Sequence, residues 1–381
     1  MKIILSGVET NNKGAELMLY AILQEIERKF PNAKVYIPTT HLKRPLNYIK
    51  TRISLRYWPY GYTVQKFHLM GLFKRLHLPT KVLQDVYPVK GADYFLDASG
   101  FHFSDQKRNF TPEKVIYWKN ILKRLKRQNC KIVFLSQAFG PAQKKNTLEG
   151  LKCISDYSDI IMPREKTSYK YLEESGVVNM EKVKLFKDFT SLVEGTFPSR
   201  YEHLRNGICI IPNMRMIDTG VCTLKDYISL MVSIINLALN SGHPVYMLNH
   251  EGAKDEELAF QCVNMASTHI DVVSGLNALE VKGMISSAYL VVSSRFHGVA
   301  SSLNSCVPCL ATSWSHKYQE LFEDYLMHEC ILPLNNLEKV NIMMNNFLDL
   351  QKNEEVRKML HPQVNLIKNE TKKMWDTVWD K

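Results

Sequence analysis

The chain has 381 residues, of which 45% are hydrophobic and 23% are charged, an ordinary composition for a globular protein. No apolar run reaches the roughly 18 residues of a membrane-spanning helix, and the first residues, MKIILSGVET, become polar too early for a signal peptide. The sequence therefore predicts a cytoplasmic protein, long enough for two domains that each bury a core.

The net charge of +11 comes from one segment. Residues 28–84 contain twelve Lys and Arg and no Asp or Glu, whereas the whole chain has 49 basic and 38 acidic residues. Such a block predicts an anionic partner. Within it, residues 63–77 can form a helix whose hydrophobic stripe is flanked by Lys66, Lys74 and Arg75, which is typical of a helix that lies on an anionic bilayer. A solvated basic face or an anionic-glycan site explains the same residues, and nucleic-acid binding is not expected because no nucleic-acid motif accompanies them.

Short apolar runs alternate with amphipathic stretches through the first half of the chain. Strands are expected at 2–6, 33–37, 93–98, 131–137 and 159–163, and helices at 14–28, 112–127 and 166–174. This alternation favours an α/β fold with a parallel sheet that is covered on both faces.

The same alternation restarts near Gly207. Strands are expected at 207–212, 244–248, 270–274, 289–294 and 308–313, and helices begin near 224, 255, 278 and 298. The residues in between, 194–206, are rich in Gly, Pro and charge and predict a linker. We therefore predict an N-terminal Rossmann-like domain over 1–195, a C-terminal one over 207–335 and a helical segment over 336–381.

The eight cysteines lie mostly in apolar stretches and are interpreted as buried thiols. Cys306 and Cys309 form a CxxC pair, but no second pair follows it. The sequence therefore predicts no metal site.

Loops that follow parallel strands are where ligands bind in such folds. The loop at residues 7–14 follows the first strand and opens onto a helix, with Asn12 and Gly14 at its end. Its small, polar residues favour phosphate binding at the helix N-terminus. A plain turn that is capped by Asn12 explains the same residues.

A second loop carries Arg295, His297 and Gly298 at the start of a helix. Arginine offers a rigid fork for carboxylate or phosphate, histidine carries protons near neutral pH, and glycine lets the backbone approach a ligand. Lys317 follows the next strand, so we expect it to join them in an anion-binding cluster. An exposed lysine at a helix start is the alternative.

Two further loops belong to the first half. Gln137 and Gly140 follow the strand at 131–137, and Arg164 follows the strand at 159–163. Arg164 is predicted either to point toward a ligand or to form a surface ion pair with an acid such as Glu165.

Taken together and in order, these loops resemble the polysaccharide pyruvyltransferase family. The matching pieces are NNKGAELML at 11–19, LDASG at 96–100, SQAFGP at 136–141, MPREKTS at 162–168, KDF at 187–189, SSRFHGVASSLNSCVP at 293–308 and SWSHK at 313–317. The RFHG segment with its downstream Pro and Lys is the most specific of them.

The resemblance implies two Rossmann-like domains that face a cleft, as in glycosyltransferases of the GT-B architecture. It implies phosphoenolpyruvate as co-substrate without a further cofactor, and a pyruvate ketal on a polysaccharide or lipid-linked oligosaccharide as product. The implied catalytic residues are His297, as proton donor, and Arg295. The implied donor-binding residues are Arg164, Arg295, Gly298 and Lys317, and the implied loop or substrate contacts are Asn12, Gly14, Glu16, Gln137 and Gly140.

Two other functions fit the same sequence. A GT-B glycosyltransferase that uses a nucleotide sugar also needs a basic group and a helix N-terminus for its diphosphate, and Glu320 is the near candidate for holding a ribose. A non-catalytic protein that binds glycan or membrane would use the basic segment. That segment also favours peripheral association with the inner face of the cytoplasmic membrane.

Overall fold

A computed structural model describes residues 1–38, 46–58, 75–76, 90–105, 111–266, 269–313, 315 and 317–380. The predicted basic helix over 63–77 lies outside the described residues, apart from residues 75–76. The chain divides into two compact units. The N-terminal unit comprises Met1–Thr10, Met18–Phe189 and Thr371–Lys381, and the C-terminal unit comprises Asn11–Leu17 and Thr190–Glu370.

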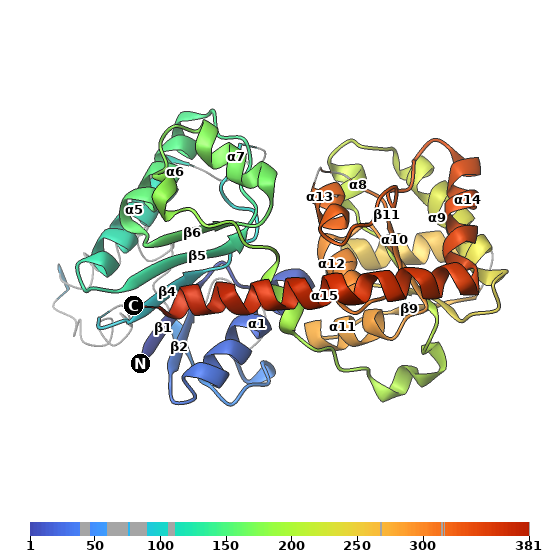
Figure 1. Ribbon diagram of the computed structural model, residues 1–381, viewed down its shortest axis with the longest axis horizontal. Coiled ribbons are helices and arrows are strands. Elements are labelled where there is room, and N and C mark those ends of the chain that lie inside the picture. Colours follow the sequence, from blue (N-terminus) through green and yellow to red (C-terminus); the bar gives the residue numbers. More distant parts are fainter. Residues whose placement is uncertain are drawn as a thin grey trace. The chain divides into compact units, whose positions relative to one another are not determined.

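Within the described residues, the N-terminal unit contains a six-stranded parallel sheet in the order β3-β2-β1-β4-β5-β6 (Figure 1). Its strands are β1 (Lys2–Ser6), β2 (Lys34–Pro38), β3 (Ser54–Trp58), β4 (Tyr94–Asp97), β5 (Lys131–Gln137) and β6 (Ile160–Pro163). Its helices include α1 (Lys13–Lys29), whose first turn belongs to the C-terminal unit, α5 (Pro112–Lys126), α6 (Lys145–Tyr157) and α7 (Lys166–Glu174). The five strands and three helices expected in this half are confirmed, and β3 and α6 were not predicted.

The strands of this sheet are buried along nearly their whole length. Ile3, Ile4 and Leu5 of β1 and residues 132–135 of β5 have no exposed surface. A parallel sheet that is covered on both faces requires such continuous apolar runs. The helices begin at local signals: Thr111 caps α5 by accepting the N–H of Lys114, and Pro112 occupies its first turn.

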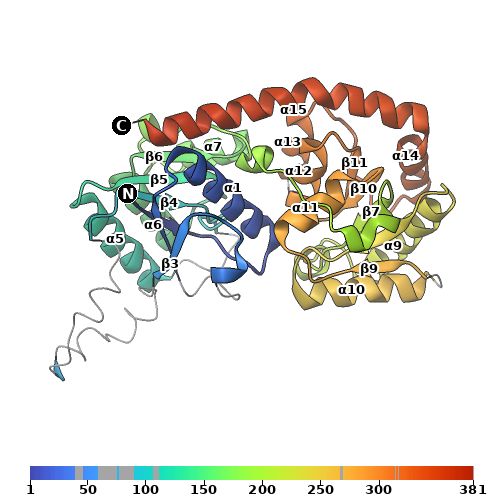
Figure 2. The same ribbon diagram turned by 90° about the horizontal axis from the view of Figure 1, so that it is seen from below.

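The described part of the C-terminal unit contains a five-stranded parallel sheet in the order β11-β10-β7-β8-β9 (Figure 2). Its strands are β7 (Ile208–Ile211), β8 (Val245–Leu248), β9 (Asp271–Val273), β10 (Leu290–Ser293) and β11 (Cys309–Ala311). Its helices are α8 (Arg215–Asp218), α9 (Leu224–Leu239), α10 (Gly252–Met265), α11 (Ala278–Ser286), α12 (Phe296–Asn304), α13 (Lys317–Asp324) and α14 (Leu337–Leu348). The strands and helix starts expected here are confirmed.

The last helix, α15 (Leu350–Trp379), contributes residues to both units. Its end belongs to the N-terminal unit, where the Trp379 ring lies 5.2 Å from that of Tyr94 and the Trp375 ring 5.7 Å from that of Phe189. The units therefore divide the chain differently from the predicted boundaries: the segment 336–381 is shared, and residues 11–17 belong with the second half. Burial of the two tryptophans explains why α15 ends in the N-terminal unit.

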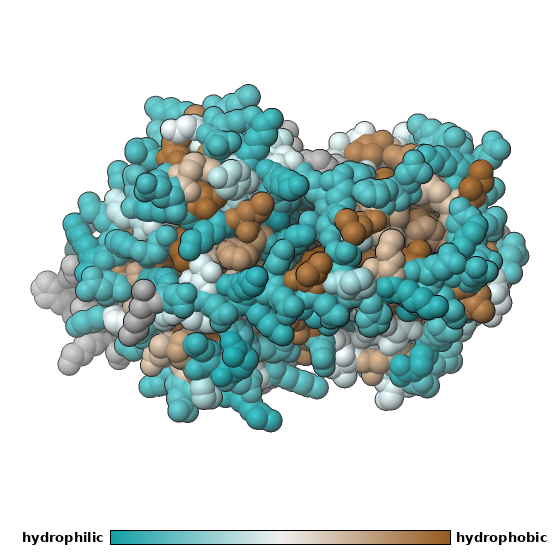
Figure 3. Space-filling model, viewed as in Figure 1, coloured by the Kyte–Doolittle hydropathy of each residue, from teal (hydrophilic) through white to brown (hydrophobic). Residues whose placement is uncertain are grey.

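The face that carries α15 is mostly hydrophilic, with scattered hydrophobic residues (Figure 3); Leu350, Met359 and Leu366 are exposed members of α15. Among the described residues, no helix combines the length and hydropathy that crossing a bilayer requires. All eight cysteines are free thiols, and burial raises the pKa of Cys130 to about 12.

Candidate active site

The strand order of the C-terminal sheet reverses between β7 and β10. From β7 the sheet continues through β8 and β9 on one side, and through β10 and β11 on the other. At such a reversal, the loops after the two strands diverge and leave space for a ligand. Residues 212–215 follow β7 and residues 294–297 follow β10, so the RFHG segment lies at this position.

The loop after β10 brings α12 close to the sheet. Ser293 Oγ accepts the N–H of Arg295 at 3.0 Å, and Arg295 is the N-cap residue of α12. A Cβ on Gly298 would overlap Ser293 Oγ and lie 3.1 Å from Cδ1 of Ile211. Only glycine therefore lets the helix begin here, and the N-terminal end of a helix attracts anions.

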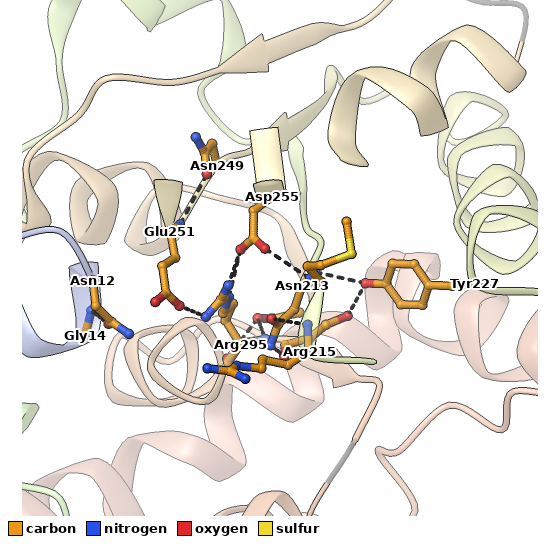
Figure 4. A network of polar contacts seen from close by, with 12 residues as sticks. Asn12, Gly14, Asn213, Arg215, Tyr227, Asn249, Glu251, Asp255 and Arg295 are labelled. Carbon is orange, nitrogen blue, oxygen red and sulfur yellow. Dashed lines mark hydrogen bonds and ion pairs between the residues drawn. The ribbon is translucent and has the colours of Figure 1, made fainter. Parts of the chain in front are cut away.

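Two carboxylates hold the guanidinium of Arg295 (Figure 4). Its Nε donates to Oδ2 of Asp255 at 2.9 Å, Nη2 donates to the same oxygen, and Nη1 donates to Glu251. Burial lowers the pKa of Arg295 to about 10, so the group stays charged at neutral pH. The guanidinium that the sequence predicts to bind a ligand is thus already bound by two carboxylates. Glu251 precedes α10, and Asp255 lies in the first turn of α10.

His297 lies against the beginning of α1. A Cβ on Gly14 would overlap Nδ1 of His297 and lie 2.7 Å from its Cγ. Asn12 Oδ1 accepts the N–H groups of Gly14 at 2.9 Å and Ala15 at 3.2 Å. Asn12 therefore caps α1, which is the plain-turn interpretation, and the same turn also brings the loop to the imidazole.

We expect Gly14→Ala to lower the free energy of unfolding by about 1–3 kcal/mol, because the added methyl overpacks the contact with His297. Urea denaturation measures the loss. The control is the same substitution in a His297→Ala background, where the imidazole is gone and the loss should shrink. An equal loss in both backgrounds would contradict the contact.

Lys13 and Glu16 lie in the same first turn of α1. Nζ of Lys13 is 2.5 Å from Oε2 of Glu16, and both side chains are buried. Glu16, predicted as a substrate contact, thus neutralises a buried lysine here. Its role toward a substrate stays a prediction.

His250 was not predicted as a site residue. It follows β8, is only 4% exposed, and its Nδ1 makes no hydrogen bond within the part of the chain that the structure describes. Burial, together with the positive charges of Arg295, His297 and Lys13, lowers its pKa well below the usual value. The polar strand-end sequence Asn249-His250-Glu251 was the available signal, but only the strand order brings it beside β7.

Hydrogen bonds between hydroxyl-bearing side chains connect the loops after β10 and β11. Tyr318 Oη donates to the carbonyl of Ser294 at 2.7 Å, and Ser294 Oγ lies 2.5 Å from Oγ1 of Thr312 and 2.6 Å from Oη of Tyr227. Lys317, next to Tyr318, is buried at the first residue of α13. The lysine is therefore not an exposed one, and its contact with a donor stays a prediction.

Arg215 is a further basic residue that the sequence analysis missed. It follows β7, is exposed, and lies beside Arg295 (Figure 4). No hydrogen bond or ion pair from the described residues engages its guanidinium. It can therefore meet an anionic ligand without first losing a partner.

Arg164 belongs to the N-terminal unit and is 6% exposed. Its Nε lies 3.3 Å from Glu165 and its Nη1 lies 3.4 Å from Asp188. The predicted pair with Glu165 is present but buried, not on the surface. The role of Arg164 as a donor contact stays a prediction.

Gln137 and Gly140 also lie in the N-terminal unit. Gln137 Nε2 donates to Oδ1 of Asp97 at 3.1 Å at the end of the neighbouring strand. Burial raises the pKa of Asp97, and hydrogen bonds from Ser99 and Gln137 oppose that shift. A Cβ on Gly140 would overlap Ser104, so this glycine allows close backbone packing.

Solved structures with similar folds were found. Anabaena Alr3699/HepE in complex with UDP and glucose is 10% identical, with a TM-score of 0.61 and coverage of 100% of this chain and 99% of the other. The UDP-GlcNAc 2-epimerase of Neisseria meningitidis, bound to UDP-GlcNAc, is 13% identical, with a TM-score of 0.61 and 99% coverage of both chains. The UDP-GlcNAc 2-epimerase of Methanocaldococcus jannaschii is 10% identical, with a TM-score of 0.59 and coverage of 93% and 94%. These similarities confirm the predicted α/β fold with two Rossmann-like domains of the GT-B type.

The family assignment rests on the sequence. No curated protein matches the chain. The family model described as polysaccharide pyruvyl transferase matches residues 12–316, a range that begins at the Asn12 cap and includes Arg295 and His297. The chain therefore belongs to the polysaccharide pyruvyl transferase family.

Proposed function

We propose that this protein transfers the pyruvyl group of phosphoenolpyruvate to a sugar of a polysaccharide or lipid-linked oligosaccharide and forms a pyruvate ketal. The observation that carries the proposal is the pair of Arg295 and His297 at the N-terminal end of α12, where the strand order reverses. A charged guanidinium, an imidazole and a helix N-terminus suit a donor that bears both a phosphate and a carboxylate.

The reaction needs one proton delivery and two additions. A proton is added to C3 of the enol, which leaves an oxocarbenium-like centre at C2. One sugar hydroxyl adds to C2, phosphate leaves, and a second hydroxyl adds to the same carbon. The two hydroxyls release two protons: one balances the proton that C3 received, and the other leaves with phosphate.

The residues after β7, β10 and β11 can supply both the proton and the positive charge that this reaction needs. His297 delivers the proton to C3, since imidazole is the usual proton carrier near neutral pH. The cations of Arg295, Arg215 and Lys317 stabilise the negative charge of the donor and of the leaving phosphate. Arg295 and Lys317 are mostly buried, where fixed charges are most effective. Gly298 keeps the start of α12 close to these groups.

Incubation with phosphoenolpyruvate and candidate free or lipid-linked oligosaccharides tests the proposal. We expect phosphate release that depends on the oligosaccharide, and a mass increase of the glycan by one ketal-linked pyruvyl group. Pyruvate in place of phosphoenolpyruvate is the control and should give no product. Glycan extension that requires a nucleotide sugar, without phosphate release from phosphoenolpyruvate, would contradict the proposal.

Transfer of a sugar from a nucleotide sugar is the second candidate. The observation in its favour is the fold shared with HepE, whose structure contains UDP and glucose, together with Glu320 in the first turn of α13. Separate titrations of the protein with phosphoenolpyruvate and with UDP-sugars, comparing the two affinities, distinguish the two donors.

We also propose a cytoplasmic protein that associates with the inner face of the membrane, where a lipid-linked acceptor is available. The basic segment 28–84 supports this, because each basic residue near an anionic surface contributes about 1 kcal/mol to binding. The residues Lys66 and Lys74, on which the idea depends, lie outside the described part of the chain.

A further inference from the structure

The two carboxylates that hold Arg295 differ in burial. The side chain of Asp255 is 1% exposed, whereas that of Glu251 is 27% exposed. Asp255 accepts from Nε and Nη2 of Arg295 through one oxygen, and from the N–H of Met214 at 3.0 Å through the other. Both carboxylate oxygens of Asp255 therefore accept hydrogen bonds, and the side chain is almost fully buried.

Glu251 is held differently. Its carboxylate contacts only Nη1 of Arg295 within the described residues, through one oxygen. Its side chain makes no capping hydrogen bond at the start of α10, and its backbone N–H is satisfied by Asn249 Oδ1 at 3.2 Å. Rotation of this side chain into water thus breaks one contact and leaves no backbone group without a partner.

We propose that Glu251 occupies, before the donor binds, the position on Arg295 that the anionic group of the donor then takes. The identity of that donor rests on the proposed function. Carboxylate and phosphate oxygens bind guanidinium N–H groups with the same geometry, so the ligand displaces Glu251 from Nη1. Asp255 stays in place and keeps the guanidinium oriented.

The charges around Arg295 favour this exchange. Arg215, the first residue of α8, faces Arg295, while His297 on α12 and Lys13 at the start of α1 lie with Arg295 around the buried His250 at the end of β8. Glu251 supplies a single negative charge to this group, whereas phosphoenolpyruvate carries more. Before the donor binds, Glu251 and Asp255 together compensate the mostly buried guanidinium, and Asp255 alone keeps it paired while Glu251 is displaced.

Such internal competition lowers the apparent affinity for the donor, since only the fraction of molecules with Glu251 displaced can bind. We therefore expect Glu251→Gln to tighten binding of phosphoenolpyruvate by about tenfold. Inorganic phosphate, as a second probe, should also bind more tightly. Isothermal titration calorimetry at constant ionic strength measures both affinities.

Two controls separate displacement from other effects. Glu257→Gln removes the same charge from the exposed face of α10, where, of the residues that the structure describes, only Gln261 donates to Glu257. This variant should leave the affinity within about twofold. Asp255→Asn should weaken binding, because the guanidinium loses its orienting carboxylate. If Glu251 serves only to position Arg295, then Glu251→Gln will also weaken binding.

The outcomes separate this inference from the proposed function. Unchanged or weaker anion binding by Glu251→Gln overturns the inference, even if phosphoenolpyruvate binds and is consumed. Tighter binding of inorganic phosphate without any binding of phosphoenolpyruvate supports the inference and contradicts the proposed donor. Absence of binding by every anion, in variants whose circular dichroism matches the unmodified protein, overturns both.

Discussion

His297→Gln is expected to lower turnover by about 100-fold or more, while phosphoenolpyruvate still binds. Glutamine keeps a polar group of similar reach, but it cannot transfer a proton to C3 of the donor. The imidazole lies at the second residue of α12 and against Gly14, so the smaller side chain fits without overpacking. The loss should therefore appear in kcat and not in the dissociation constant of the donor.

Steady-state phosphate release, combined with calorimetric titration of the donor, measures these two quantities. His361→Gln on the exposed side of α15 is the matched control and should keep full turnover. Near-full activity of His297→Gln would show that the residue contributes only a hydrogen bond. The proton carrier would then have to be another group, and His250 is the neighbouring imidazole.

Asp255→Ala is expected to lower the free energy of unfolding by about 3–5 kcal/mol, because it removes one partner of a buried ion pair. The guanidinium of Arg295 stays mostly buried, and the partly exposed Glu251 is then its one remaining carboxylate partner among the described residues. The N–H of Met214 also loses its acceptor. An unsatisfied buried donor adds to the loss.

Urea denaturation of three variants measures this effect. Glu251→Ala should cost about 1 kcal/mol or less, since partly exposed pairs contribute little. Asp255→Asn keeps the volume and should fall between the two, which preserves the comparison if Asp255→Ala does not fold. Equal losses of unfolding free energy for Asp255→Ala and Glu251→Ala would contradict the expectation that the more buried ion pair contributes more to stability.

Local sequence was enough to predict most of the elements and the segment that carries the chemistry. Buried parallel strands are continuous apolar runs, and β1, β5 and β10 were identified on that basis. Among the described strands and α-helices of the N-terminal unit, two were missed for local reasons. The strand β3, SLRYW, mixes charge with aromatics inside the basic segment, and α6, KNTLEGLKCISDY, begins without a side-chain cap.

The partners of these residues depended on the order of the strands. Arg295 and Asp255 are 40 positions apart, and they meet because β8 and β10 flank β7 in the sheet. The close approach of Gly14 and His297 likewise joins residues that are far apart in the sequence. A side chain's chemistry is set by its own type and its neighbours along the chain, whereas strand order follows from long-range packing of helices on the sheet. The sequence therefore identified the arginine and the histidine, and only the folded structure showed that two carboxylates already hold the arginine.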